Sequence, residues 1–418
     1  MKRVDLAPLK VREFRILLFS SATSVFGDGI TSVALVFAVL DATGSVSDVG
    51  LVLSCRVFPQ VVLLLMGGVI ADRGRRDRVM ALSQLASGLC ESALACLLLL
   101  GDAKLWALAL AYMGMGCAQA TFKPASSGLV RQLMPTRDLP AANGLMSMAQ
   151  STGLIIGPAV GGIIAAAGSP GMAIGIDAST FLASAFLLGR LKIALPYATR
   201  SPQGLLRGLR DGWGVVRSRR WLWAMIGFFS VFQFTVLGGL YVLGPAVARA
   251  RLGGAAAWGL MLAASGVGSL LGGGLALRWR PRRLLVGANA SVLGVVPAFV
   301  ALSAAAPAAV GVAAMALYGL SLAYGETLWE SALQANVPAD KLSRVAAYDW
   351  LGSTALRPLG LALAGPIAAA IGTDAELLAI AAAVVLGVTV LLAVPDVRQV
   401  GLDTGAAAVA VAAAKGGT

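Results

Sequence analysis

The chain has 418 residues, of which 58% are hydrophobic and only 13% are charged. Soluble domains carry about 25% charged residues, so this composition excludes an ordinary soluble protein and indicates a polytopic membrane protein. The formal net charge is +13, and there is no histidine. Because the basic residues lie in short segments between apolar runs, they indicate membrane topology and not nucleic-acid binding.

The residues that usually carry chemistry are scarce in this sequence. All four cysteines lie inside apolar runs, which favours small packing residues over a disulfide or metal framework. The sequence contains no phosphate-binding glycine-rich loop, nucleophile elbow or metal-ligand cluster. We therefore predict that the protein is not an enzyme and uses no cofactor. Without histidine, proton chemistry must use carboxylates, and an ion gradient is the expected energy source.

Twelve apolar runs of about 20 residues follow one another along the chain, each long enough to cross the membrane as a helix. The first run is too long for a signal-peptide core and is expected to remain as a helix. The expected spans are 16–40, 48–71, 79–101, 104–126, 141–167, 171–190, 222–246, 256–277, 284–304, 308–331, 345–371 and 375–395.

A hydrophilic stretch at 191–220 separates the first six runs from the last six. Its apolar residues alternate with arginines at helical spacing, which predicts an amphipathic helix on the membrane surface. We expect an N-terminal six-helix bundle at 1–190, a C-terminal bundle at 221–396, and a loosely ordered cytoplasmic tail rich in alanine and glycine at 397–418.

Basic residues are distributed unequally between alternate loops. With the N-terminus in the cytoplasm, the outer loops hold only Lys104, Arg249 and Arg251, and every inner loop is basic. One missed helix would invert all later loops, so this asymmetry supports the count of twelve. The positive-inside rule then predicts a multi-pass membrane protein with both termini in the cytoplasm.

The loop after the second run reads GGVIADRGRRDRV. It resembles the loop-2/3 signature of the major facilitator superfamily, G-x-x-x-D-R-x-G-R-R, although an ordinary positive loop is the alternative. Four residues occupy signature positions: Gly68, Asp72, Arg73 and Arg76. The resemblance implies an all-α fold of two six-helix pseudo-repeats. It also implies that Asp72 docks near the start of the eleventh helix and holds the outward-open state. Because Asp349 lies near that helix start, Arg73 or Arg76 is expected to bridge the two acids.

The fifth run contains GLIIGPAVGG, which resembles the antiporter signature G-x-x-x-G-P-x-x-G-G of drug/proton exporters in this superfamily. Five residues match: Gly153, Gly157, Pro158, Gly161 and Gly162. Glycines four apart leave a flat helix face that lets another helix approach closely, and the proline favours a bend. A generic small-residue packing motif is the alternative. The Gly-Pro pair recurs at 365–366, which fits a duplicated six-helix unit.

Charged residues inside the apolar runs cost about 3 kcal/mol each on insertion scales, so each needs a reason. Asp28 and Arg56 lie about 20 Å along neighbouring spans and are expected to pair. The pair is either a fixed ion pair, or Asp28 exchanges between Arg56, a proton and a substrate. Glu91 is a further candidate for proton coupling, with a protonated, packed acid as the alternative, and Asp177 is expected to be a packed acid. Many proton-coupled members of the superfamily carry an arginine in the fourth helix before Gly116, and this chain has none there. Asp28 and Arg56 are therefore the main candidates for the proton relay.

The second half offers its own ionisable candidates. Glu326 and Glu330 are four residues apart and share one face of the tenth run. Two carboxylates that close in a low dielectric do not both ionise cheaply, which suits a proton carrier. Simple hydration of Glu330 at the membrane surface is the alternative. Arg357, midway along the eleventh run, is expected to pair with Glu326.

The segments FKPASSGLVRQLMP and AANGLMSMAQSTGLIIGPAVGG are similar to bacterial exporters of the enterobactin and macrolide type. The resemblance implies a monomer in the bacterial inner membrane that exports a small amphipathic organic molecule in exchange for protons, by alternating access. Its expected partners are that substrate, protons and the lipid bilayer. A facilitator that imports a nutrient remains an alternative, as does a membrane sensor or partner subunit without transport.

Overall fold

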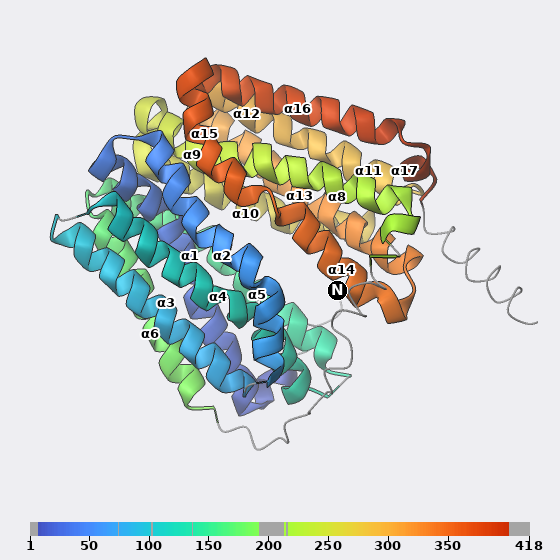
Figure 1. Cartoon of the computed structure of the whole chain (residues 1–418), viewed down its shortest axis with the longest axis horizontal. Coiled ribbons are helices and arrows are strands. Elements are labelled where there is room, and N and C mark those ends of the chain that lie inside the picture. The colour runs from blue at the N-terminus through green and yellow to red at the C-terminus, as the bar shows by residue number, and fades with distance from the viewer. Residues whose placement is uncertain are drawn as a thin grey trace, which may run out of the picture. The chain divides into compact units, whose positions relative to one another are not determined.

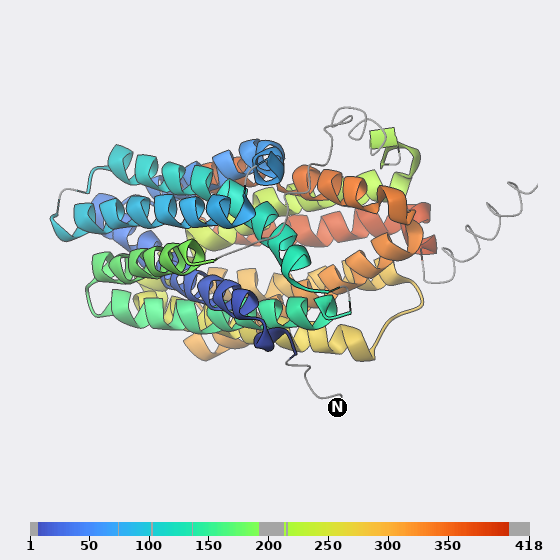
Figure 2. The ribbon, with the colours of Figure 1, turned by 90° about the horizontal axis from the view of Figure 1, so that it is seen from below.

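A computed structural model (Figures 1 and 2) describes residues 7–73, 75–101, 103–135, 137–191, 213–214 and 216–400. Every regular element in these ranges is helical. Twelve segments are long and apolar enough to cross a membrane, which confirms the predicted number of spans and the all-α fold. Most of the predicted linker helix and the tail after residue 400 lie outside the described residues.

Each of the first six spans is one continuous helix. A short 3-10 turn, η1 (Ala7–Lys10), precedes the first of them. They are α1 (Arg12–Thr43), α2 (Val46–Arg73), α3 (Arg76–Leu99), α4 (Leu105–Leu133), α5 (Leu139–Ala166) and α6 (Pro170–Gly189). Both views show these six helices running alongside one another (Figures 1 and 2). α1 packs against α5 and α6, α3 against α4 and α6, and α2 against α4.

The part of α1 from Val33 to Leu40 is apolar on all sides, which is typical of a buried helix. Every residue from Val33 to Leu40 is buried. Gly44 ends the helix in the left-handed conformation, with φ of 69°, and its N–H bonds the Leu40 carbonyl at 2.9 Å. A residue with a Cβ adopts that conformation only at a cost, so glycine suits this helix end.

The last six spans include three that are interrupted. The seventh comprises α8 (Arg220–Phe232), the π-helical turn η2 (Gln233–Leu237), α9 (Gly238–Val247) and η3 (Ala248–Leu252), and the eighth is α10 (Gly254–Arg278). The ninth comprises α11 (Leu284–Val292), η4 (Leu293–Val295) and α12 (Val296–Ser303), and the tenth is α13 (Ala308–Asn336). α14 (Ala339–Thr354) and α15 (Arg357–Ile371) form the eleventh, followed by α16 (Thr373–Ala393) and the short α17 (Pro395–Gln399).

Prolines account for two of these interruptions. Pro297 follows η4 at the second position of α12, and Pro358 stands at the second position of α15. Proline lacks a backbone N–H and disfavours a helical conformation in the residue before it, so a helix tends to restart there. As a result Arg357 lies at the first turn of α15 and not within an unbroken helix.

The chain divides into two compact units by the density of its contacts. Unit 1 is Met1–Ser201, Val242–Ala263 and Leu361–Pro366; unit 2 is Pro202–Tyr241, Ala264–Gly360 and Ile367–Thr418. Unit 1 therefore contains α1 to α6 together with short parts of the second half of the sequence. The predicted domain boundaries at the 191–220 linker remain a prediction.

Candidate functional site

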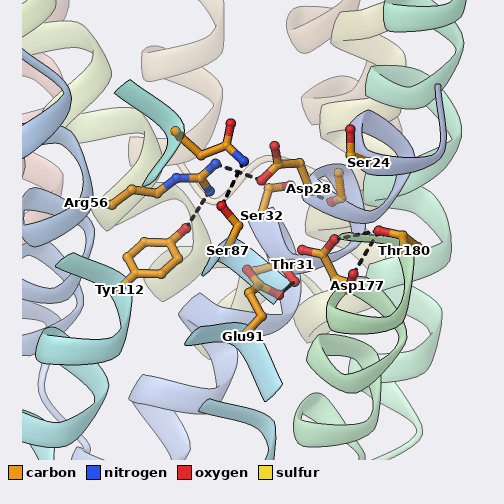
Figure 3. Close-up of polar contacts among 12 residues, drawn as sticks. Ser24, Asp28, Thr31, Ser32, Arg56, Ser87, Glu91, Tyr112, Asp177 and Thr180 are labelled. Atoms are coloured by element: carbon orange, nitrogen blue, oxygen red, sulfur yellow. Dashed lines mark hydrogen bonds and ion pairs between the residues drawn. The ribbon is translucent and has the colours of Figure 1, made fainter. Parts of the chain in front are cut away.

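A cluster of polar side chains lies inside unit 1, on α1, α2, α3, α4 and α6 (Figure 3). At its centre the Asp28 carboxylate accepts a hydrogen bond from the Arg56 guanidinium, with Oδ1 and Nη2 2.7 Å apart. This ion pair is the one expected from the sequence. The Asp28 side chain is 33% exposed and that of Arg56 is 18% exposed, so the pair is neither sealed nor open to the surface.

Tyr112 on α4 completes the environment of Arg56. Arg56 Nη1 donates a hydrogen bond to the Tyr112 hydroxyl at 3.1 Å, and its guanidinium carbon lies 5.3 Å from the centre of the tyrosine ring. Gly116, one turn further along α4, lets the two helices meet here: a Cβ on Gly116 would lie 2.2 Å from the Arg56 carbonyl oxygen. Sequence reasoning noted the missing arginine in this helix but did not identify Tyr112 as a site residue.

The glycines on either side of Asp28 position its backbone. A Cβ on Gly27 would lie 2.0 Å from Oδ1 of Asp177 on α6, so a larger residue would displace that acid. A Cβ on Gly29 would lie 2.8 Å from the carbonyl oxygen of Gly153 on α5. The α1 backbone is therefore held closely between α5 and α6 at the residue that carries the negative charge.

The residues that resemble the antiporter signature form the other side of this contact. Cβ atoms on Gly153, Gly157 and Gly161 would each lie 2.3 to 2.8 Å from atoms of α1. A Cβ on Gly162 would lie 2.6 Å from the Ala255 carbonyl oxygen, in the part of α10 that belongs to unit 1. The close helix approach expected from these glycines is confirmed, and Pro158 is buried within the continuous α5.

Two further acids lie deeper in the cluster. Glu91 on α3 is 1% exposed and Asp177 on α6 is fully buried. Thr31 donates to Glu91 Oε2 at 3.4 Å, and Thr180 donates to Asp177 Oδ1 at 3.1 Å (Figure 3). Among the described residues, Glu91 Oε1 and Asp177 Oδ2 have no hydrogen-bond partner. Each acid is packed as expected, and both face α1, Glu91 at Thr31 and Asp177 at Gly27.

Uncharged polar groups extend the cluster between α1, α3, α4 and α6. Gln84 donates to Ser184 Oγ at 2.9 Å, and the hydroxyl groups of Ser184 and Ser20 lie 2.6 Å apart. Gln119 on α4 donates to Ser87 Oγ at 3.1 Å. A buried network whose members are hydrogen-bonded fixes the relative rotation of its helices, so these residues help to orient the charged pair.

The loop that resembles the superfamily signature is described only in part. The side chains of Asp72 and Arg73 and the surroundings of Gly68 are not described, although α2 extends to Arg73. Arg76 donates to the Gly128 carbonyl at 3.0 Å and so packs on α4. Its predicted bridging role toward Asp349 remains a prediction.

An ion pair not anticipated from the sequence begins α3. Arg75 contacts Asp77, with Nη2 and Oδ2 2.7 Å apart. The hydrogen bond and the charge of Asp77 raise the pKa of the Arg75 guanidinium above its usual value. In the signature pattern these two positions hold a glycine and a basic residue, so the ion pair lies where this loop departs from the pattern.

The candidates in unit 2 are more scattered. Glu326 and Glu330 are both exposed on α13. Asp349 on α14 accepts hydrogen bonds from Trp329 Nε1 at 2.9 Å and from Ser353 Oγ at 3.4 Å. Arg357 Nε is buried without a hydrogen-bond partner among the described residues. The predicted pairing of Glu326 with Arg357 remains a prediction.

Twelve helical spans apolar enough to cross a membrane, with an aspartate–arginine pair inside the first six, are typical of a secondary transporter. The match to the model of the Major Facilitator Superfamily, over residues 17–360, shows that the chain belongs to that superfamily. The protein is thus a multi-pass membrane transporter by family, and the predicted membership of this superfamily is confirmed.

Two of the similar proteins are named as efflux proteins. The chain is 28% identical over 415 residues to the multidrug efflux pump Tap of Mycobacterium tuberculosis, covering 93% of this chain and 94% of the pump. It is 21% identical over 370 residues to macrolide efflux protein A of Streptococcus pyogenes, covering 87% and 91%.

Solved structures share the fold at lower sequence identity. The nucleoside transporter NupG has a TM-score of 0.71 at 14% identity, covering 91% of this chain and 98% of its own. A bacterial homolog of the human lysosomal transporter Spinster has a TM-score of 0.71 at 15% identity, covering 94% and 98%. At these identities the likeness concerns the fold alone.

Proposed function

We propose that this protein exports a small amphipathic organic molecule, such as a drug, antibiotic or siderophore, from a bacterial cytoplasm in exchange for protons. It works as a monomer in the inner membrane with both termini in the cytoplasm, by alternating access between its two six-helix halves. The names of its efflux relatives support the direction and the substrate class. The ion pair between Asp28 and Arg56 is the observation that supports the coupling of transport to protons.

The three acids of the cluster differ in how exposed their side chains are, and in our proposal only the most exposed one, Asp28, exchanges its partner. The Asp28 side chain is 33% exposed, whereas Glu91 and Asp177 are 1% and 0% exposed. A proton or a cationic group of a substrate can therefore approach Asp28 without displacing a packed helix. This difference favours an exchangeable ion pair at Asp28 over a fixed one.

Protonation of Asp28 changes what Arg56 faces. The ionised carboxylate neutralises the guanidinium at 2.7 Å, and the protonated acid leaves Arg56 with the neutral hydroxyl of Tyr112. A partly buried charge that loses its partner costs several kcal/mol, so the two states of Asp28 favour different arrangements of α1 and α2. A substrate cation that displaces Arg56 from Asp28 also removes the partner of Arg56, and so favours the same change in the arrangement of α1 and α2.

In our proposal, the contact between the glycines of α1 and α5 transmits the shift of α1 that follows protonation of Asp28. Gly29 follows Asp28 directly and packs on Gly153 and Gly157, with no side chain between the two backbones. Packed interfaces respond to displacement by switching arrangement and not by gradual deformation. A shift of α1 at Asp28 is thereby linked to α5, where the antiporter signature lies.

Glu91 and Asp177 have a supporting role in this mechanism. Thr31 lies one turn from Asp28 on α1 and donates to Glu91, and Asp177 lies against Gly27, the residue before Asp28. Each buried acid thereby holds its own helix, α3 or α6, against α1. The pair thus positions α1, α3 and α6 around Asp28.

Flux measurements in inside-out membrane vesicles test the proposal. Vesicles from a strain that lacks its own drug pumps and produces this protein are energised by respiration, and a panel of macrolides, other antibiotics and siderophores is added. We expect uptake of at least one compound into the vesicles and its abolition by an uncoupler. Uncoupler-insensitive equilibration would indicate a facilitator, and binding without flux would indicate a sensor or partner subunit; either result contradicts the proposal.

A further inference from the structure

A pocket of about 510 Å³ opens on unit 1 where α1 begins and α6 ends. Its lining consists of Arg12, Arg15, Ile16, Phe19, Leu187 and Arg190. Arg15 precedes Asp28 by 13 residues on the same helix, about 20 Å at 1.5 Å per residue. The pocket is therefore separate from the charged pair, at the end of the helices that we propose faces the cytoplasm.

The charged part of this pocket is entirely basic. Its three arginines make no ion pair with any of the described residues. The guanidinium carbon of Arg190 lies 4.1 Å from the centre of the Phe186 ring, which holds that side chain at the rim. The neighbouring segments 1–6 and 192–212 each contain more basic than acidic residues, so their charge does not complement the pocket.

The other part of the pocket is apolar and faces outward. Phe19 is 61% exposed, and the adjacent Phe186 is 59% exposed. Ile16 and Leu187 lie between these rings and the arginines along α1 and α6. Phe19 lies seven residues into α1 from Arg12, about 10 Å deeper, where the hydrocarbon of a membrane begins. A ligand that fits must carry an anionic group at one end and an apolar chain at the other.

We propose that this pocket binds one anionic phospholipid of the inner leaflet. The phosphate lies among Arg12, Arg15 and Arg190, and an acyl chain runs along Phe19 and Phe186. Guanidinium groups bind phosphate oxygens in pairs of hydrogen bonds, and basic pockets between helix ends suit lipid head groups. The lipid holds the start of α1 against the end of α6, which couples the lipid composition of the membrane to the helix that carries Asp28.

Native mass spectrometry of the delipidated full-length protein tests this site. Phosphatidylglycerol and phosphatidylcholine with identical acyl chains are titrated against wild type, R12Q/R15Q/R190Q and a matched control, R278Q/R282Q/R283Q, which loses three arginines at the inner ends of α10 and α11. We expect wild type and control to bind a first phosphatidylglycerol at least tenfold more tightly than phosphatidylcholine. The pocket variant should bind it about 100-fold more weakly, since each arginine contributes about fivefold.

Several results would overturn the proposal. They are equal binding of both lipids to wild type, unchanged binding by the pocket variant, or an equal loss in the control. Competition by glycerol phosphate at the concentration of the lipid would indicate a soluble phosphate compound instead. If R12Q/R15Q/R190Q does not fold, Phe19→Trp reports on the site with every charge retained. Its added fluorescence should be quenched more by brominated phosphatidylglycerol than by brominated phosphatidylcholine, and equal quenching would refute the site.

Discussion

The substitution Gly157→Ala tests how closely the α5 signature holds α1 at Asp28. The new Cβ would lie 2.6 Å from the Phe26 carbonyl oxygen and 2.7 Å from Gly29 Cα, where ordinary contacts begin at 3.4 Å. The helices must therefore separate locally by almost 1 Å. Overpacking of this kind costs about 1–3 kcal/mol. Because Asp28 lies between the two contacted residues, the same shift should also disturb its ion pair with Arg56.

Gly144→Ala, on the same helix, is the matched control. Its Cβ meets no atom within 4 Å, so alanine should only improve helix propensity, by about 1 kcal/mol. Thermal unfolding in detergent and drug resistance of cells that produce each variant measure the two effects. We expect Gly157→Ala to melt lower and to lose most resistance, and Gly144→Ala to match or exceed wild type in both. Indistinguishable variants would refute the reasoning that links the signature to Asp28.

Three further substitutions probe the same account. Tyr112→Phe removes the 3.1 Å hydrogen bond to Arg56 and keeps the ring, so efflux should fall about tenfold, as expected for a bond to a charged group; an unchanged rate in vesicles contradicts this. Asp72→Asn should lower turnover with little change in substrate affinity, and a large affinity loss at normal turnover argues against a gating role. Glu91→Gln keeps a hydrogen-bonding side chain and should retain both melting temperature and transport, whereas a folded but inactive Glu91→Gln would place Glu91 in the exchange itself.

Several features of the fold could be predicted because they depend on local properties of the chain. Hydropathy over about 20 residues located all twelve spans, since each span must be apolar wherever its neighbours lie. The glycine pattern of α5 predicted a close helix contact, because residues without side chains offer little else to pack. The pairing of Asp28 with Arg56 followed from their similar depth, since an isolated charge there is costly.

Other features depend on helix rotation and could not be predicted from one sequence. Tyr112 reaches Arg56 because the face of α4 that carries it also carries Gly116, one turn away. The missing side chain at Gly116 lets this face approach α2 closely. The burial of Glu91 and Asp177 beside α1 requires α3 and α6 to present both acids to that helix. The tyrosine could have been found from its spacing to the glycine, whereas the two buried acids leave no comparable pattern in the sequence.

Proton release on substrate binding tests the central claim most directly. Purified protein in weakly buffered detergent is mixed with a transported compound, and a pH indicator records the protons released while binding is measured in parallel. Asp41→Asn is the matched control. Asp41 also lies on α1, near the C-terminal end of the helix, and it pairs with an arginine, Arg249, at 2.9 Å. We predict that wild type and Asp41→Asn release protons, and that Asp28→Asn binds substrate without releasing any. Substrate-induced release that persists in Asp28→Asn would contradict the account.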